Sequence, residues 1–590
     1  MSGIQHLASS SSIELDNNNF DPTPYNGGDD VQSLNSEYSN IESVKSKSLK
    51  ISRTETAKSL AELGISSSIP RSGINRPPVE NPIFPEEYTL ETETGIVPVQ
   101  SLQVIGRSKT IVSTEEKEEK PIDSDIELVT FRIDDPENPH NWNPVIVWIY
   151  TIIFSLFVIC AAYGSSSLAG GLFTINEKFH VSTEVSTLSV SLMVIGFSLG
   201  PLIWAPLSEQ IGRRPVYIIS FGLYVIFNIP CALAKNIGTV LVCRLLCGIF
   251  SSSALTNVGA SLVDMHNETR SLAIAFFSFA PYSGPVFGGI VNGFISVSTK
   301  RYDMMVWVNM AFAGVMWIIV AFIPETYAPV ILKRRAAKLR KETGNSKIMT
   351  EQELSPLSFS ELVNECLIRP LKFIVTEPVL DLICGFVALI YSLLYAFFFA
   401  YPVIFNKLYG YKDNIIGLLY IPILIGAALA LTTTPILEKQ YAKLCKRRKP
   451  EPEDRLVGAM IGAPFPCIAL FILGATSYQH IIWVGPASSG IAFGYGMVLI
   501  YYSLNNYIID TYAKYAASAL ATKVFLRSTG GAAFPLFTTQ MYDRLGLQWA
   551  SWLLAFISLA MVAIPFTFYK YGKGLRAKLC KEDYTLSAHE

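Results

Sequence analysis

Long apolar runs alternate with short polar connections from about residue 147 to residue 569, and this alternation is the strongest pattern in the chain. Each run has about 20 residues or more, enough for an α-helix to cross about 30 Å of hydrocarbon. The pattern predicts twelve membrane-spanning helices, at 147–168, 183–206, 215–234, 238–263, 271–294, 304–323, 379–401, 414–437, 456–476, 481–506, 517–541 and 548–569.

One connection is much longer than the others. Residues 324–378 are polar and basic, and they divide the apolar runs into two sets of six. We therefore expect an all-α membrane protein with 12 transmembrane helices in two six-helix bundles. The N-terminal bundle is expected at 145–323 and the C-terminal bundle at 379–570, joined by a cytosolic linker at 324–378.

The two ends of the chain lack long apolar runs. Residues 1–135 are rich in Ser, Asn, Thr and Glu, and such a composition cannot bury a core. They are predicted to form a disordered cytosolic tail, and residues 571–590 a short cytosolic tail. No cleavable signal peptide is visible at the N-terminus.

Lys and Arg are concentrated in alternate connections, which fixes the expected orientation. Arg213 and Arg214, the linker from Lys333 to Lys372 and the stretch from Lys439 to Arg455 all fall on one side. Positively charged connections stay in the cytosol, so both termini are predicted to be cytosolic. A plasma membrane location is expected, with the vacuolar membrane as the alternative.

Composition narrows the class of protein. Hydrophobic residues make up 50% of the chain and charged residues 16%, and the mean hydropathy is +0.35. Soluble proteins carry about a quarter charged residues. The net charge of -1 gives no attraction to nucleic acid, and the nine cysteines show no metal-binding spacing. No hydrolase, nucleotide-binding or metal motif is present, so we expect neither an enzyme nor a cofactor.

The turn between the second and third runs, residues 205–214, combines a carboxylate, a glycine and two arginines. Gly212 permits a tight turn, and Glu209 is suited to the positive N-terminal end of a neighbouring helix. Asp264, at the inner end of the fourth run, lies at the right depth to pair with Arg213. The alternative is that Arg213 and Arg214 are ordinary positively charged residues of a cytosolic turn.

Two further motifs lie inside the runs. Arg244 is early in the fourth run, and a guanidinium in a bilayer normally faces protein or water; alternatively, it reaches the outer surface with its long side chain. The fifth run contains Gly284-Pro285-Val286-Phe287-Gly288-Gly289. Its small residues permit close helix contact, and Pro285 removes a backbone donor. Generic helix packing is the alternative interpretation.

Together these motifs resemble the major facilitator superfamily. The turn is similar to its G-x-L-a-D-r-x-G-r-r motif, although Ala205 replaces a glycine, Glu209 an aspartate and Gln210 an arginine. Residues 135–139, 324–327 and 506–510 narrow the resemblance to the fungal 12-segment drug:proton antiporter family, over residues 134–575. It implies the major facilitator fold, a conformational latch in which Glu209 meets the eleventh helix, and a proton-coupling role for Arg244. Gly284, Pro285, Gly288 and Gly289 then match its antiporter motif.

A substrate cavity is expected near the midplane, where helices 1, 4, 7 and 10 of such a fold face each other. Its candidate lining is polar and aromatic: Tyr163, Asn257, Tyr391, Tyr395, Phe399, Tyr495, Tyr502 and Asn505. Tyrosine and phenylalanine rings suit flat, lipophilic or cationic compounds. No carboxylate lies at the middle of any run, so Asp510 and Arg527 join Arg244 as proton-coupling candidates. Arg527 is either deep in the bundle or interfacial.

These observations predict a proton-coupled antiporter that exports drugs or other small organic compounds by alternating access. A polyamine exporter of the same fold is the first alternative, and a transporter-like nutrient sensor is a second. The expected partners are a small organic substrate, protons and the lipid bilayer. We expect a monomer that binds no nucleic acid.

Overall fold

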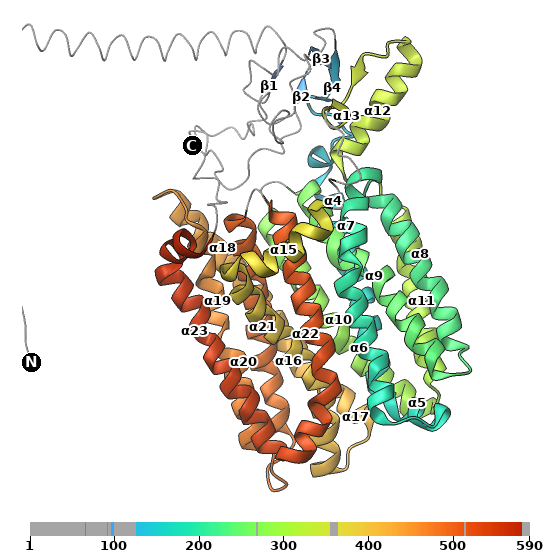
Figure 1. The fold of residues 1–590 in the computed structure, drawn as a ribbon, viewed down its shortest axis with the longest axis vertical. Helices are drawn as coiled ribbons and strands as arrows, with labels where there is room; N and C mark the ends of the chain where they lie inside the picture. Colours follow the sequence, from blue (N-terminus) through green and yellow to red (C-terminus); the bar gives the residue numbers. More distant parts are fainter. Residues whose placement is uncertain are drawn as a thin grey trace, which may run out of the picture. The chain divides into compact units, whose positions relative to one another are not determined.

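The computed structural model describes residues 65–66, 91–92, 96–98, 126–266, 269–354, 361, 364–512 and 515–580. Most of the predicted N-terminal tail and residues 581–590 lie outside these ranges. Within them the structure is almost entirely helical (Figure 1).

The first six predicted helices occur where the apolar runs place them, with one bent and the others continuous. The bent helix consists of α6 (Thr183–Leu199) and α7 (Pro201–Ile211), which meet at 41°. The bend falls at Gly200 and Pro201, and proline cannot donate the backbone hydrogen bond that would continue a straight helix. The others are α4 (Pro144–Ser166), α8 (Arg213–Ala232), α9 (Ile237–Met265), α10 (Arg270–Thr299) and α11 (Tyr302–Ala321). A short helix, α5 (Leu172–Phe179), precedes α6.

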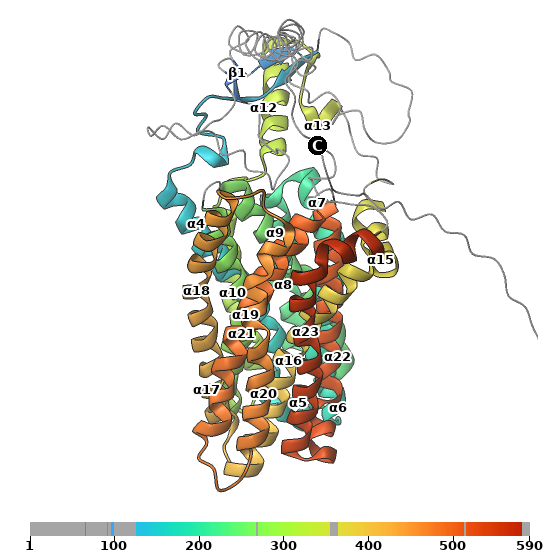
Figure 2. The same cartoon turned by 90° about the vertical axis from the view of Figure 1, so that its left-hand side faces the viewer.

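The second set begins after the linker and lies beside the first (Figures 1 and 2). Two of its helices are interrupted, one between α17 (Asp413–Leu418) and α18 (Ile421–Cys445) and one between α19 (Val457–Gly462) and α20 (Pro464–Thr476). A short 3-10 turn, η4 (Pro452–Leu456), precedes α19. The remaining helices are α16 (Pro378–Tyr409), α21 (Val484–Thr511), α22 (Ala516–Leu545) and α23 (Leu547–Leu579).

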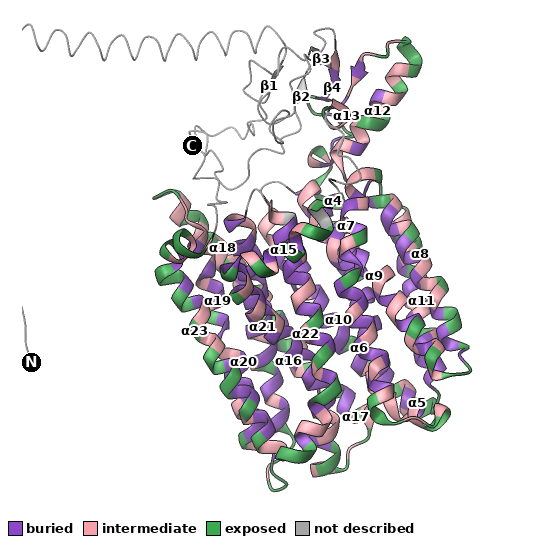
Figure 3. Cartoon of the chain, in the orientation of Figure 1, coloured by how far each residue is buried: buried purple, intermediate pink, exposed green. Residues whose placement is uncertain are grey.

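Ten helices among the described residues are long and apolar enough to cross a membrane, and the bent α6–α7 pair adds an eleventh. The remaining predicted run, at 517–541, forms α22, which has 30 residues but contains Lys523 and Arg527. Figure 3 shows that buried residues gather where helices face one another, while many exposed residues lie on outward faces. Large apolar side chains such as Ile226, Val315 and Phe556 are exposed there, as expected for lipid-facing positions.

The linker folds instead of running as a plain loop. It contains α12 (Ala328–Thr343), β6 (Ile348–Met349), α13 (Glu351–Leu354), a π turn η3 (Asn364–Ile368) and α15 (Arg369–Thr376). We call the end of the bundle where α7 meets α8 and α12 begins the linker end, and the opposite end the far end (Figure 1).

Part of the segment predicted to be disordered forms short strands. β4 (Glu127–Val129) lies between β3 (Ile96–Pro98) and β6 in one sheet, with β3 antiparallel and β6 parallel to it. β2 (Glu91–Thr92) lies between β1 (Ile65–Ser66) and β5 (Phe131–Arg132) in another. Val129 is buried with Ala336 of α12 and Ile348 of β6. Residues 127–132, at the end of the predicted disordered tail, therefore form strands: β4 pairs with β3 and with β6 of the linker, about 200 residues later, and β5 pairs with β2.

Candidate functional site

The predicted turn at residues 205–214 places Arg213 in a cluster of polar residues at the linker end. Its Nε lies 3.4 Å from Asp264 Oδ2 of α9, and its Nη1 donates a 2.5 Å hydrogen bond to Ser208 Oγ. The guanidinium also lies 4.7 Å from the ring centre of Tyr327. Both partners of the ion pair are largely buried, so their attraction is weakly screened by solvent. We call Ser208, Arg213, Asp264, Glu325 and Tyr327 the N-half cluster.

Glu325 connects this cluster to the linker. Its carboxylate accepts hydrogen bonds from the backbone N–H groups of Arg213, at 2.8 Å, and Arg214, at 3.3 Å. These groups begin α8, where unpaired N–H donors and the helix dipole favour an anion. Arg334 of α12 lies 3.9 Å from the same carboxylate. The sequence identified Glu325 only through the family resemblance, although a carboxylate directly after the sixth run is a usable signal.

The turn itself requires glycine. Gly212 has φ +103° and ψ 161°, a conformation that is essentially restricted to glycine. A Cβ there would overlap Oε2 of Glu325. Glu209 is half-buried, and its carbonyl oxygen accepts a hydrogen bond from Gln352 of α13. The contact of the Glu209 carboxylate with the eleventh helix, α22, stays a prediction.

Asp510 lies at the linker end of the C-terminal half, in a second charged cluster. Arg455 Nε is 3.1 Å from Asp510 Oδ2, and Arg455 Nη1 is 3.2 Å from Glu438 Oε1. The same guanidinium lies 3.6 Å from the ring centre of Tyr441. We call Glu438, Tyr441, Arg455 and Asp510 the C-half cluster. Asp510 was predicted as a site residue and Arg455 was not; this arginine could have been found by comparing the corresponding turns of the two halves.

Arg244 is fully buried, so the alternative in which it reaches the outer surface is wrong. Its Nε donates to the carbonyl oxygen of Ser189 at 2.9 Å, and its Nη2 donates to the carbonyls of Gly164 at 2.8 Å and Ser165 at 3.1 Å. Gly164 and Ser165 belong to the last turn of α4, where the helix dipole favours a cation. Arg244 thus ties α9 to α4 and α6 through oxygen atoms.

The glycine-rich stretch of α10 packs on two sides. A Cβ atom at Gly284 would lie 2.6 Å from the carbonyl oxygen of Ile159 in α4. A Cβ atom at Gly288 would lie 2.8 Å from the carbonyl oxygen of Tyr163 in the same helix. On Gly289 the nearest atoms belong to the Tyr420 ring in the C-terminal half, at 3.0 Å. Pro285 is buried, and its carbonyl accepts a hydrogen bond from Ser166 at 2.7 Å. The small residues therefore allow close contact both within the N-terminal half and between the halves.

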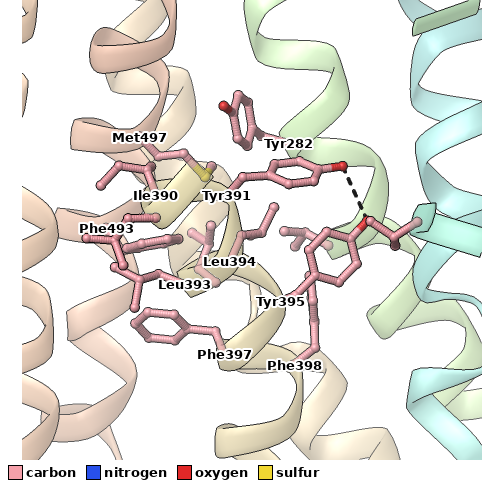
Figure 4. Packing of buried hydrophobic residues seen from close by; sticks show 14 of the residues in the cluster. Tyr282, Ile390, Tyr391, Leu393, Leu394, Tyr395, Phe397, Phe398, Phe493 and Met497 are labelled. Carbon is pink, nitrogen blue, oxygen red and sulfur yellow. Dashed lines mark hydrogen bonds between the residues drawn. The ribbon is translucent and has the colours of Figure 1, made fainter. Parts of the chain in front are cut away.

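Aromatic side chains fill the space between the two halves near the middle of the helices (Figure 4). Tyr282 of α10 meets Tyr391 of α16 and Tyr501 of α21 edge to face, with ring centres 5.8 and 5.0 Å apart. Tyr395 pairs with Ser165 of α4 through a 2.7 Å hydrogen bond and lies 3.4 Å from the hydroxyl of Tyr391. Tyr391 and Tyr395 were predicted lining residues; Tyr282 was missed, because it follows Pro281 in a helix expected to serve only packing.

Two cations of α22 adjoin these rings. Arg527 donates from Nη1 to the hydroxyl of Tyr501 at 3.1 Å, and its guanidinium lies 4.5 Å from the ring centre of Tyr391. Lys523, one turn earlier, donates to Asn505 Oδ1 and lies 4.8 Å from the ring centre of Tyr501. Both are buried, which places Arg527 deep in the bundle and not at the interface. We call Tyr391, Tyr501, Lys523, Asn505 and Arg527 the central cluster.

The other predicted lining residues are more scattered. Tyr163 accepts a 2.9 Å hydrogen bond from Asn292 of α10, and Asn257 donates to the carbonyl of Trp204 at 3.2 Å. Tyr495 packs on Phe465 of α20 and lies 3.3 Å from Thr433 of α18, within the C-terminal half. Phe399 and Tyr502 are buried. The structure thus brings Tyr391, Tyr395 and Asn505 together with Arg527, but not Asn257 or Tyr495.

Comparisons with known proteins agree with this architecture. Residues 152–535 match the model of the Major Facilitator Superfamily. The multidrug transporter TPO3 of Candida glabrata is 62% identical, over 94% of this chain and 94% of that protein. Polyamine transporter 3 of Saccharomyces cerevisiae is 59% identical, over 95% of this chain and 96% of that protein. Polyamine transporter 2 of the same yeast is 61% identical, over 92% of this chain and 94% of that protein.

A solved structure supports the fold. The proton:xylose symporter XylE bound to 6-bromo-6-deoxy-D-glucose superposes with a TM-score of 0.54 at 18% identity, covering 76% of this chain and all of that one. This likeness concerns the fold alone, and it confirms the predicted all-α fold class. The family match and the relatives that align over most of the chain lead to the same conclusion: the chain belongs to the Major Facilitator Superfamily of membrane transporters.

Proposed function

We propose that this protein is a proton-coupled antiporter that exports drugs or other small organic compounds across the membrane. The observation that carries the proposal is identity of about 60% to a multidrug transporter and two polyamine transporters over more than nine tenths of the chain. A more distant relative, the efflux pump FUBT of Fusarium oxysporum, is 39% identical over 76% of this chain.

The arrangement of the two halves supports alternating access. A substrate would sit between α4 and α10 on one side and α16, α21 and α22 on the other, where Tyr282, Tyr391 and Tyr395 meet. These rings present both π faces and hydroxyl groups, which suit flat organic molecules. Rocking of the halves would separate the rings and open the site to one side at a time.

The N-half cluster is the second support for rocking. It connects the ends of α8 and α9 through a buried ion pair at the linker end, which a change of tilt would break or remake. We assign the N-half cluster the role of a latch that keeps the linker end of the transporter closed during part of the transport cycle. Arg244, Asp510 and Arg527 remain our candidates for proton coupling.

Export of polyamines is the second candidate function, favoured by the names of two relatives. The central cluster speaks against a polycation at that position, because its charged members, Lys523 and Arg527, are themselves positive. Drug-like neutral or anionic compounds fit this charge better.

We further propose that both termini and the linker face the cytosol, and that the protein acts as a monomer in the plasma membrane. The basic linker helix α12, with Lys333, Arg334 and Lys341, supports this orientation. The proposed bundles span 145–323 and 379–570.

The test uses cells that lack or overproduce the protein, exposed to a panel of drugs, polyamines and weak acids. Inside-out vesicles from overproducing cells should accumulate the exported compound when a pH gradient, acidic inside, is imposed. An ionophore that collapses the gradient should stop accumulation. Accumulation that persists with the ionophore would contradict antiport, and equal tolerance of both strains to every compound would contradict export.

A further inference from the structure

Buried cations in the described part of the chain fall into two groups by how their charge is compensated. Arg213 and Arg455 each lie within 4 Å of a carboxylate, and Arg244 donates to carbonyl oxygens at a helix end. Lys523 and Arg527 differ, because no carboxylate among the described residues lies within ion-pair distance of either. Two positive charges one turn apart on α22 are therefore buried together without a counter-charge.

Such an arrangement is costly. Removing a cation from water costs several kcal/mol unless an opposite charge or full hydrogen bonding compensates it. The guanidinium of Arg527 has only partial compensation: Nη1 donates to Tyr501, the plane packs on Tyr391, and Nε is buried with no hydrogen bond partner. An arginine does not lose its proton at physiological pH, so it cannot escape this cost by becoming neutral.

The carboxylates of the surrounding helices lie outside ion-pair distance of Lys523 and Arg527; one of them, Asp381, has a buried Oδ1 without a hydrogen bond partner among the described residues. On α21, Asp510 is bound by Arg455. On α16, Asp381 lies in the first turn, about 15 Å along the helix from Tyr391. α4 and α10 contain no Asp or Glu within their bounds. The protein thus supplies donors and positive charge at this position, and leaves the acceptor to be provided from outside.

The donors also have the geometry to hold an anion. Lys523 and Arg527 are four residues apart, so their side chains lie on one face of α22. A guanidinium binds a carboxylate through two parallel hydrogen bonds, and an ammonium adds a point charge. The rings of Tyr391, Tyr501 and Tyr282 surround them and offer apolar surface for the rest of a molecule.

We propose that Lys523 and Arg527 form an anion-binding subsite in the centre of the transporter, which takes the carboxylate of an apolar or aromatic organic acid. The ligand's carboxylate replaces the missing counter-charge, and its apolar body lies against the tyrosine rings. This inference rests on the proposed export function and names the class of compound that its central site prefers. It predicts that anionic compounds bind better than neutral or polycationic ones of similar size.

The experiment uses the purified full-length protein and three probes at pH 7: 2-naphthoate, the neutral isostere 2-naphthamide, and spermidine. Binding is followed by the melting temperature in differential scanning fluorimetry. Naphthoate should raise the melting temperature by about 2 °C or more at saturating concentration, and naphthamide and spermidine by much less. An equal or larger shift with spermidine or naphthamide would overturn the proposal.

Substitutions at Lys523 and Arg527 test whether these two residues bind the naphthoate. R527Q and K523Q should each lose most of the naphthoate shift, whereas K235Q, which removes one exposed lysine at the far end, should retain it. R527K keeps the charge in case R527Q does not fold, and should retain part of the shift. A naphthoate shift that is unchanged in K523Q and R527K would overturn the subsite.

A vesicle assay separates the two proposals. If vesicles accumulate a neutral drug from the panel but naphthoate neither binds nor competes, the anion subsite is wrong and the export function stands. If naphthoate raises the melting temperature but no compound is transported under an imposed pH gradient, the export function is wrong and the subsite stands.

Discussion

The N-half and C-half clusters occupy corresponding positions but are tied to different parts of the chain. In the N-terminal half, the turn between α7 and α8 binds Glu325, and the linker reaches the cluster through Arg334. In the C-terminal half, the segment before α19 binds α23 of its own bundle through Glu453 and Arg576. The N-half cluster is thus connected to the linker, while the C-half cluster lies beside a connection to α23 of its own bundle and, through Asp510, is within electrostatic range of Arg270 of α10.

The same difference appears in how each arginine is used. Arg213 contacts one carboxylate, and the second carboxylate nearby, Glu325, is held by backbone N–H groups. Arg455 contacts two carboxylates, Asp510 of α21 and Glu438 of α18. The first arrangement suits a contact that opens and closes, because Glu325 keeps its backbone partners when only the side chain of Arg213 moves. The second holds two helices together and is expected to serve stability.

The largest expected effect is on export after Arg213→Ala. Loss of the guanidinium removes the contacts with Asp264 and Ser208, so the latch state is no longer favoured. Export per molecule should fall at least tenfold, which corresponds to about 1.4 kcal/mol in the barrier. The measurement is vesicle transport normalised to protein in the membrane.

Arg214→Ala is the matched control, since the neighbouring side chain is exposed and, among the described residues, donates only to the carbonyl of Ala321. It should retain at least about half of the export, as expected for an exposed contact. Normal export by R213A at normal abundance would remove the latch from the mechanism.

The next effect is on stability after Arg455→Ala. Asp510 and Glu438 would be left without their cation, and breaking a buried pair in this way costs about 3–5 kcal/mol. The melting temperature and the amount of folded protein should fall. Lys573→Ala removes an exposed ion pair with Glu451 and should change stability by less than about 1 kcal/mol. A variant R455A that melts like the wild type but does not transport would place the C-half cluster in the transport cycle.

The helices could be predicted from the sequence because an uncharged apolar run of about 20 residues matches the thickness of a bilayer and seldom occurs in a soluble fold. The pairing of Arg213 with Asp264 could also be predicted, since helix ends on one side of a membrane lie at the same depth. That Glu325 joins them could not, because this depends on how the chain folds back after α11. The strand at 127–129 was missed for a similar reason: one of its partners, β6, lies in the linker, far away in sequence.

The central cluster shows the same limit. Tyr391, Tyr395 and Asn505 were found by helix number and residue type, and they do lie near the two cations of α22: Tyr391 contacts Arg527 and Tyr395 follows it, while Asn505 binds Lys523. Tyr495 has the same type and lies on the same helix as Asn505, but it packs on Phe465. Residue type does not specify which face of a buried, uniformly apolar helix points inward, because no polar face marks the direction.

Two glycines with the same backbone conformation give a sharper comparison of the two ends of the bundle. Gly212 has φ +103° and ψ 161°, and Gly546, between α22 and α23 at the far end, has φ +82° and ψ 162°. A Cβ at Gly212 would overlap the Glu325 carboxylate, whereas at Gly546 the nearest atom is 4.0 Å away. Each alanine variant should lose about 1–3 kcal/mol through backbone strain.

Gly212→Ala should in addition displace Glu325 and lower export, and Gly546→Ala should not. The two variants are compared by melting temperature and by vesicle transport. Equal export by both would mean that the position of Glu325 does not matter for transport, and that the N-half cluster is structural like its counterpart.

The smallest effects on export are expected where the segment before α4 contacts the linker helix α12. Arg335 of α12 lies 2.6 Å from Asp135, which is buried, and 2.6 Å from Glu137, which is exposed. Glu137→Gln should change stability by less than about 1 kcal/mol, and Asp135→Asn by about 1.5–3 kcal/mol. Burial alone would raise the pKa of Asp135, but hydrogen bonds from Arg335 and from the N–H groups of Glu137 and Arg132 lower it below its usual value.

A carboxylate with a lowered pKa stabilises the folded state at every pH above its unfolded value of about 3.9, and this contribution is lost only as the pH falls through the lower folded value. The difference in melting temperature between D135N and the wild type should therefore be constant from pH 5 to pH 8. A difference that shrinks toward pH 5 would mean that Asp135 takes up a proton in that range. The contact between the linker and the N-terminal segment would then respond to acidification on the linker side of the membrane.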